Sequence, residues 1–138
     1  MRMVLDCSVT MAWCFEDESD DYSEGVLDAL ARGEALVPGL WTYEVINVLA
    51  VAKRRGRLTE AEGMSFLRLL SRLPVTVAAA PTGAERATVL SLCHQHQLTG
   101  YDAAYLALAL REGLPLATRD RGLRVACVAA GVADVVPG

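Results

Sequence analysis

Apolar residues along the chain follow two spacings, one typical of buried strands and one typical of helices. We predict strands at the short apolar runs bounded by Gly, Pro or charge, which are residues 3–7, 35–38, 75–79, 114–118 and 133–136. Elsewhere apolar residues recur every three to four positions, which predicts helices over about 19–32, 40–55, 60–73, 82–97, 99–113 and 121–131. Strands that alternate with helices indicate a parallel sheet covered on both faces. The predicted fold class is therefore α/β, a three-layer α/β/α sandwich.

Capping residues mark several of the predicted helix ends. Thr59 and Glu62 have the spacing of a capping box, and Thr82 and Glu85 repeat it, so each threonine is predicted to begin a helix. Ser19 is predicted to cap the helix that stops at Gly33.

Length and composition fit one domain over residues 1–138. The 138 residues are 53% hydrophobic, but no apolar stretch reaches the roughly 18 to 20 residues of a membrane span. The N-terminus lacks the basic region, apolar run and cleavage site of an export signal. We therefore expect a soluble, cytoplasmic protein that does not contact membranes.

Charge is segregated along the chain. The net charge of −4 argues against a protein that coats nucleic acid non-specifically, and six acids crowd into residues 16–24. Basic residues gather at 53–57 and 119–124, and their guanidinium groups match phosphate oxygens. The candidate phosphate contacts are Arg54, Arg55, Arg119 and Arg121. The alternative, that these arginines only solvate a helix end and a loop, stays open.

Four carboxylates stand where a plain hydrophobic core does not explain them, namely Asp6, Glu44, Asp102 and Asp120. Asp6 and Asp120 follow predicted strands, and Asp102 lies on a predicted helix among apolar neighbours. Each of these three also has a structural explanation, as a strand terminator, a residue of a helix cap or an N-cap. Glu44 is harder to explain, because an unpaired carboxylate on the apolar face of a helix costs several kcal/mol.

The four acids become chemically informative if they meet at the strand ends, where α/β folds bind ligands. Two bare carboxylates about 4 Å apart repel by roughly 4 kcal/mol at an effective dielectric constant near 20, and a divalent cation removes that repulsion. The scattered cysteines and the pair His94 and His96 do not have zinc-ligand spacing. Oxygen ligands alone favour Mg²⁺ or Mn²⁺, which commonly act on phosphodiesters.

Three blocks in a fixed order carry a resemblance to a known family: VLDCSVTMAWCFEDE, LVPGLWTYEVINVLAVAKRRGRLT and LTGYDAAYLALALREGLPLATRDRGL. Over nearly its whole length the sequence resembles the PIN-domain ribonucleases, specifically the VapC-type toxins of type II toxin–antitoxin pairs. The resemblance implies a PIN-like fold and a Mg²⁺- or Mn²⁺-dependent endoribonuclease.

The resemblance also assigns roles to the acids. It implies that Asp6, Asp102 and Asp120 bind the metal, while Glu44 is a water-mediated ligand or proton acceptor. Water activated by the metal would attack phosphorus in line, leaving a 5′-phosphate and a 3′-hydroxyl. Ser8 and Thr118 match positions next to the ligands. Gly122 stands where some relatives carry a further polar or acidic group. The number of metal ions that the site binds, one or two, therefore stays open.

The partners implied by the resemblance are RNA, a second copy of the chain in a homodimer, and a small antitoxin protein whose peptide fills the acidic cleft. Candidate surfaces for the two proteins are the helix residues Tyr22, Val26, Phe66, Leu67, Leu69 and Leu70. Core packing explains these residues equally well.

Three alternatives remain at this point. The first is a nuclease-shaped module that binds RNA without cleaving it. The second comes from DCSVT, which is close to the D-x-D-x-T loop of haloacid-dehalogenase-type phosphatases, although Ser8 replaces their second aspartate. The third is a phospho-receiver domain, which shares the acid at a strand end but does not explain Glu44 and Asp102 on helices.

Overall fold

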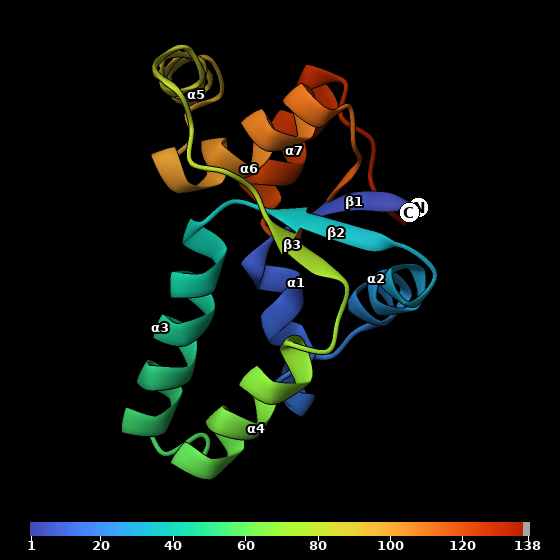
Figure 1. Cartoon of the computed structure of the whole chain (residues 1–138), viewed down its shortest axis with the longest axis vertical. Coiled ribbons are helices and arrows are strands. Elements are labelled where there is room, and N and C mark those ends of the chain that lie inside the picture. Colours follow the sequence, from blue (N-terminus) through green and yellow to red (C-terminus); the bar gives the residue numbers. More distant parts are fainter. Residues whose placement is uncertain (137–138) are drawn as a thin grey trace.

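The computed structural model of the chain describes residues 1–136 and has a four-stranded parallel sheet at its centre (Figure 1). The strand order is β3-β2-β1-β4, with β1 at Arg2–Leu5, β2 at Glu34–Val37, β3 at Val75–Val77 and β4 at Leu116–Ala117. All three strand pairs are parallel. The helices are α1 (Cys7–Ala12), η1 (Glu16–Glu18), α2 (Asp21–Ala31), α3 (Leu40–Arg54), α4 (Glu60–Leu70), α5 (Gly83–His96), α6 (Gly100–Glu112) and α7 (Arg121–Ala130).

Helices cover both faces of the sheet, which confirms the predicted three-layer sandwich. The helices α1 and α2 lie on one face, where α3 and α4 extend the layer as a hairpin (Figure 1). On the other face lie α6 and α7, and α5 packs against α6 away from the sheet (Figure 1). Three of the four residues of the central strand β1 are fully buried, with Met3, Val4 and Leu5 all 0% exposed.

The junction of α2 and β2 brings two backbones together closely. The amide of Glu34 donates to the carbonyl oxygen of Met1 at 2.9 Å, next to Gly33. A Cβ atom at Gly33 would lie 1.9 Å from that carbonyl oxygen, so this position requires glycine. The glycine therefore sets the register between β1 and β2.

The local capping signals were correct in most cases. Thr59 accepts from the amide of Glu62, and the Glu62 carboxylate accepts from the amide of Thr59, which completes a capping box. Thr82 caps α5 by accepting from the amide of Glu85. The carboxylate of Glu85 is paired with Arg111 of α6.

Three predicted elements need correction. The first strand ends at Leu5 instead of residue 7, because Cys7 already begins α1. Asp20, not Ser19, caps α2, since its carboxylate accepts from the amide of Ser23 at 2.7 Å. Residues 133–136 form no strand; in this segment Asp134 accepts the hydroxyl of Tyr22.

Among the residues predicted to contact partner proteins, some are buried in the core and others are exposed. Val26 is 0% exposed, and the Tyr22 hydroxyl donates to Asp134 at 2.6 Å, so this part of α2 faces the interior. Phe66 and Leu70 are also buried, whereas Leu69 is 57% exposed. Within residues 1–136, no helix combines the length and apolar character needed to cross a bilayer.

Candidate active site

Asp6 and Thr118 directly follow the paired strands β1 and β4, so the parallel register brings them together at one edge of the sheet. The Asp6 carboxylate is 5% exposed. Its Oδ2 accepts the Thr118 hydroxyl at 2.6 Å and the Ser8 hydroxyl at 2.7 Å. Both residues that the resemblance places beside the ligands therefore contact the same oxygen of Asp6.

Backbone amides fix the direction of these two hydroxyl groups. Ser8 Oγ accepts from the amide of Arg119 at 2.9 Å, and Thr118 Oγ1 accepts from the amide of Asp120 at 3.0 Å. Because each hydroxyl accepts from an amide, its own proton is left for Asp6. Burial raises the pKa of Asp6, and the hydroxyls of Thr118 and Ser8 partly oppose that rise.

Asp120 is the N-cap of α7, as its structural explanation proposed. Its Oδ2 accepts from the amide of Leu123 at 2.8 Å. The charge of Asp120 also raises the pKa of both Asp6 and Asp102, so it lies near enough to both to repel them. Capping engages one oxygen of this carboxylate, which leaves Oδ1 for another role.

Asp102 occupies the third position of α6, where its amide donates to Thr99 Oγ1 at 3.1 Å. Its carboxylate accepts no hydrogen bond from any residue between 1 and 136. Burial, then the charges of Asp120 and Asp6, raise the pKa of Asp102 from 3.8 to about 6. This half-buried acid therefore has no compensating donor, as expected of a group that binds something else.

Glu44 of α3 approaches the same cluster from the opposite layer. Burial raises its pKa, as do the charges of Asp6 and Asp102, while a hydrogen bond from Tyr105 lowers it. The Tyr105 hydroxyl donates to Glu44 Oε1 at 2.6 Å. The sequence analysis gave Tyr105 no role in the site. Its position three residues after Asp102, on the same helix face, was the signal for such a role.

The fit of this cluster to a metal ion rests on its donor chemistry. Burial and the charge of at least one other acid raise the pKa of Asp6, Glu44 and Asp102, and all four acids offer hard oxygen atoms, the ligands that Mg²⁺ and Mn²⁺ prefer. In residues 1–136, no three Asp, Glu, His or Cys side chains are gathered closely enough to hold a metal ion as they stand. The residues therefore fit the ion by the chemistry of their donor atoms.

The arginines near the site differ in how they are engaged. Arg119 Nε lies 3.2 Å from Asp20 Oδ2, and Arg119 Nη1 lies 3.9 Å from Glu18 Oε1, so acids of the 16–24 segment hold this guanidinium. Arg54, Arg55 and Arg121 are exposed at a helix end or start. Arg124, which the sequence interpretation did not select, donates to the Thr118 carbonyl at 2.7 Å.

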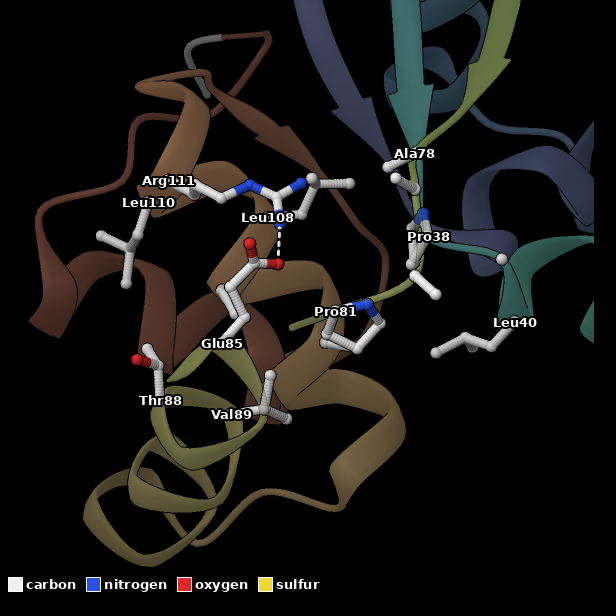
Figure 2. A pocket seen from close by; sticks show the side chains of 15 residues that line it. Pro38, Leu40, Ala78, Pro81, Glu85, Thr88, Val89, Leu108, Leu110 and Arg111 are labelled. Atoms are coloured by element: carbon white, nitrogen blue, oxygen red, sulfur yellow. Dashed lines mark hydrogen bonds and ion pairs between the residues drawn. The ribbon is translucent and has the colours of Figure 1, made fainter. Parts of the chain in front are cut away.

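Two large pockets lie elsewhere on the described part of the chain, and none of the four acids lines either of them. An apolar pocket of about 780 Å³ is enclosed by the start of α3, the β3–α5 loop, α5 and α6, with the Glu85–Arg111 ion pair across it (Figure 2). A second groove of about 870 Å³ runs between η1 and α4. We call it the η1–α4 groove; its apolar lining includes Trp13, Phe15, Phe66 and Leu69, and its charged lining includes Glu16, Asp17, Arg57 and Glu62.

Comparison with known proteins identifies the class to which this fold and cluster belong. The PIN domain family model matches residues 3–128, so the chain belongs to the PIN domain family. Ribonuclease VapC3 of Pyrobaculum aerophilum is 32% identical over 123 residues, which are 89% of this chain and 92% of that protein. Because the chain belongs to the PIN domain family, the phosphatase and phospho-receiver alternatives no longer apply.

Solved structures show the same fold. The crystal structure of PAE2754 from Pyrobaculum aerophilum superimposes with a TM-score of 0.70 at 27% identity, covering 98% of this chain and 92% of that one. A toxin–antitoxin complex from Klebsiella pneumoniae has a TM-score of 0.58 at 18% identity, covering 86% of both chains, and shares the fold.

Proposed function

We propose that the chain is a VapC-type endoribonuclease that depends on Mg²⁺ or Mn²⁺ and acts as the toxin of a toxin–antitoxin pair. The observation that carries the proposal is that Asp6, Glu44, Asp102 and Asp120 come from four different parts of the chain, and that the charges of Asp6, Asp102 and Asp120 act on the other acids of the cluster. The ribonuclease name of the 32% identical relative supports the same activity. The expected place of action is the cytoplasm.

Under this proposal, Asp6, Asp102 and Asp120 hold the divalent cation, and Glu44 contacts the water beside it. When bound, the cation supplies an acidified water and positive charge opposite the phosphate. Ser8 and Thr118 hold Asp6 ionised and in one orientation through Oδ2. Asp120 caps α7 with Oδ2 and offers Oδ1 to the site.

The remaining residues act on the proton and on the substrate. Glu44 takes the proton of the attacking water, and the in-line attack needs no 2′-hydroxyl, so the products carry a 5′-phosphate and a 3′-hydroxyl. Arg54, Arg55 and Arg121 are exposed and available for RNA phosphates. Arg119 exchanges its acidic partners Asp20 and Glu18 for phosphate when RNA is present.

We assign the antitoxin to the η1–α4 groove, from which its peptide continues towards the four acids. The apolar lining of Trp13, Phe15 and Phe66 suits the apolar face of a short helix. Glu16 at the same groove suits a basic residue of that peptide, while Asp17 is already paired with Arg57. An arginine at the end of the peptide would then face the carboxylates.

The homodimer is assigned to the face around the apolar pocket of Figure 2. Leu110 of α6 lines this pocket and is 41% exposed, and α5 buries only Leu92 among its described residues. We expect Leu110→Glu to convert the dimer to a monomer in light scattering, while Val128→Glu, on α7, leaves the mass unchanged. A wild-type protein that is monomeric at micromolar concentration contradicts this assignment.

The activity is tested by incubating purified protein with total RNA and Mg²⁺ or Mn²⁺ beside an Asp6→Asn variant. We expect cleavage by the wild type alone, with 5′-phosphate ends in end mapping. Equal cleavage by both proteins overturns the site assignment, and cyclic phosphate ends overturn the mechanism. RNA binding without cleavage by the wild type supports the non-catalytic module instead.

A further inference from the structure

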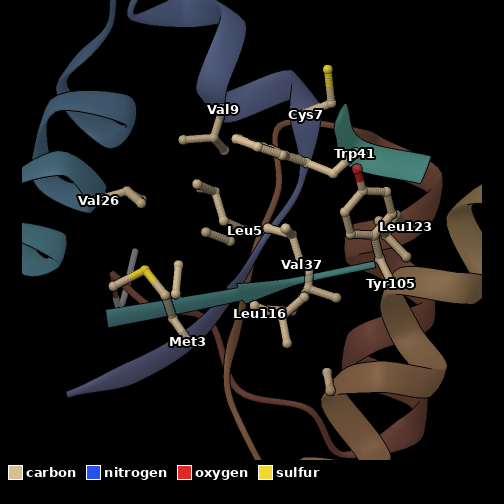
Figure 3. Packing of buried hydrophobic residues seen from close by; sticks show 14 of the residues in the cluster. Met3, Leu5, Cys7, Val9, Val26, Val37, Trp41, Tyr105, Leu116 and Leu123 are labelled. Carbon is tan, nitrogen blue, oxygen red and sulfur yellow. The ribbon is translucent and has the colours of Figure 1, made fainter. Parts of the chain in front are cut away.

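Tyr105 is a buried polar residue that the proposed reaction has not used. Its side chain is 0% exposed. Figure 3 shows the Tyr105 ring in the core cluster that also contains Trp41 and Leu123, with its oxygen at the end of the core where Cys7 lies. A phenylalanine would fill the same volume, so packing alone does not require the hydroxyl group.

The Tyr105 hydroxyl has one hydrogen-bond partner within residues 1–136, which is Glu44 Oε1 at 2.6 Å. The bond joins α6 to α3 across 61 residues of sequence. A short hydrogen bond from a neutral hydroxyl to a carboxylate is among the stronger protein hydrogen bonds. Burial and the neighbouring Glu44 raise the pKa of Tyr105 far above its usual range, so the hydroxyl is a permanent donor and not a base.

The bond also determines what the Glu44 carboxylate can do. With Oε1 engaged by Tyr105, rotation of the carboxylate is restricted, and Oε2 is the oxygen left for water. Tyr105 and Asp102 lie three residues apart on α6, so they share one face of that helix. The same helix therefore presents a candidate metal ligand and the group that orients Glu44.

We infer that Tyr105 is a positioning residue whose hydroxyl fixes Glu44 of α3 with Oε2 directed to the reacting water. The expected effect of Tyr105 on RNA cleavage rests on the proposed nuclease function. The structural link between Tyr105 and Glu44 does not rest on it. Two separate measurements follow, one of stability and one of cleavage.

The stability measurement uses metal-free protein and the variants Tyr105→Phe, Glu44→Ala and the double variant. In the wild-type background, Tyr105→Phe removes the donor of a half-buried carboxylate, and we expect the melting temperature to fall by about 3 to 6 °C. In the Glu44→Ala background the hydroxyl has lost its acceptor, so its removal should raise the melting temperature. The same fall in both backgrounds overturns the link.

The kinetic measurement uses a short RNA substrate with Mn²⁺, well below the melting temperature of every variant. Tyr105→Phe should lower kcat about tenfold and leave KM unchanged, because Glu44 is misoriented while the RNA contacts remain. In the Glu44→Ala background, Tyr105→Phe should cause no further loss. An unchanged kcat, or an effect confined to KM, overturns the positioning role.

Leu30→Val is the matched control. Leu30 is 0% exposed and lies on α2, and it lines neither the apolar pocket nor the η1–α4 groove. Its substitution should lower the melting temperature as Tyr105→Phe does, without a change in kcat. If the wild type cleaves no RNA at all, the proposed function fails, whereas the melting temperatures still decide whether Tyr105 and Glu44 are coupled.

Discussion

Asp6 keeps a carboxylate inside the protein because two oriented hydroxyl groups stabilise its charge. An ionised group that is 5% exposed is costly unless donors replace the lost water. Thr118 supplies one of those donors at 2.6 Å and also accepts from the amide of Asp120. One threonine therefore links two of the four acids.

We expect Thr118→Val, which keeps the shape of the side chain, to lower the free energy of unfolding by about 2 to 3 kcal/mol, because it leaves a buried carboxylate short of a donor. Cleavage should fall about 10- to 100-fold as Asp6 loses its orientation. Urea denaturation and RNA cleavage measure the two effects. Thr88→Val is the control, since Thr88 is exposed and its hydroxyl bonds only Ala84 of its own helix. Equal losses in the two variants contradict this account of Asp6.

Asp102 makes the folded state less stable as the pH rises. A salt-bridged acid, whose pKa is lowered by folding, has the opposite effect. The pKa of Asp102 is raised from 3.8 to about 6, so between these values the folded state binds more protons than the unfolded state. The contribution of Asp102 to the stability of the metal-free protein therefore falls as pH rises from about 4 to about 6 and stays lower above that.

Asp102→Asn should remove this dependence. After screening by solvent, we expect the variant to be about 1 kcal/mol more stable than the wild type at pH 7 and no more stable at pH 4. Thermal unfolding across this pH range in the presence of a chelator measures the difference. A variant that is less stable at pH 7 would show that Asp102 is a structural cap and not a strained acid.

Most elements were predictable from the sequence because their signals are local. Thr59, Thr82 and Thr99 each accept from an amide three residues ahead, and those residues are adjacent on any helix. The helix α1 was missed because its N-cap residue, Asp6, makes no side-chain cap. That carboxylate is engaged by Ser8 and Thr118 instead, and 110 residues separate Ser8 from Thr118.

The unpredicted features of the site depend on contacts between distant segments. The four acids could be selected because a carboxylate among apolar neighbours is visible in the sequence alone. The partners of Tyr105 and Arg119 could not be predicted from the sequence. Glu44 comes close to Tyr105, and Asp20 to Arg119, only in the folded chain. The predicted last strand at 133–136 failed for a similar reason, because Asp134 is bound to Tyr22 of α2.

The turn between α2 and β2 is expected to tolerate no side chain. In Gly33→Ala, the new Cβ would stand 1.9 Å from the Met1 carbonyl oxygen, so β1 and β2 must separate locally. We expect the free energy of unfolding to fall by about 2 to 3 kcal/mol. Gly39→Ala is the control, since nothing lies within 4 Å of its Cβ position, and its effect should stay within about 0.5 kcal/mol. Similar midpoints for both variants in urea would contradict this explanation of the β1–β2 register.

The protein as a whole should gain stability from the cation that its acids are proposed to bind. At ten times its dissociation constant, a ligand that binds only the folded state adds about 1.4 kcal/mol. We expect Mn²⁺ to raise the melting temperature at pH 7 by about 4 to 6 °C, and EDTA to reverse the rise. Asp102→Asn should abolish the response. A rise of the same size in that variant would mean that the ion binds elsewhere.

The four acids are spread from Asp6 in the first turn after β1 to Asp120 at the start of α7. On the ribosome, a growing chain exposes Asp6 first, but the hydroxyl of Thr118 that holds it emerges only after more than a hundred further residues. A nascent or prematurely terminated polypeptide that stops before Thr118 therefore lacks both that hydroxyl group and the carboxylate of Asp120. Under the proposed toxin function, unfinished copies would be inactive, and an inhibitory partner would need to bind only the completed chain.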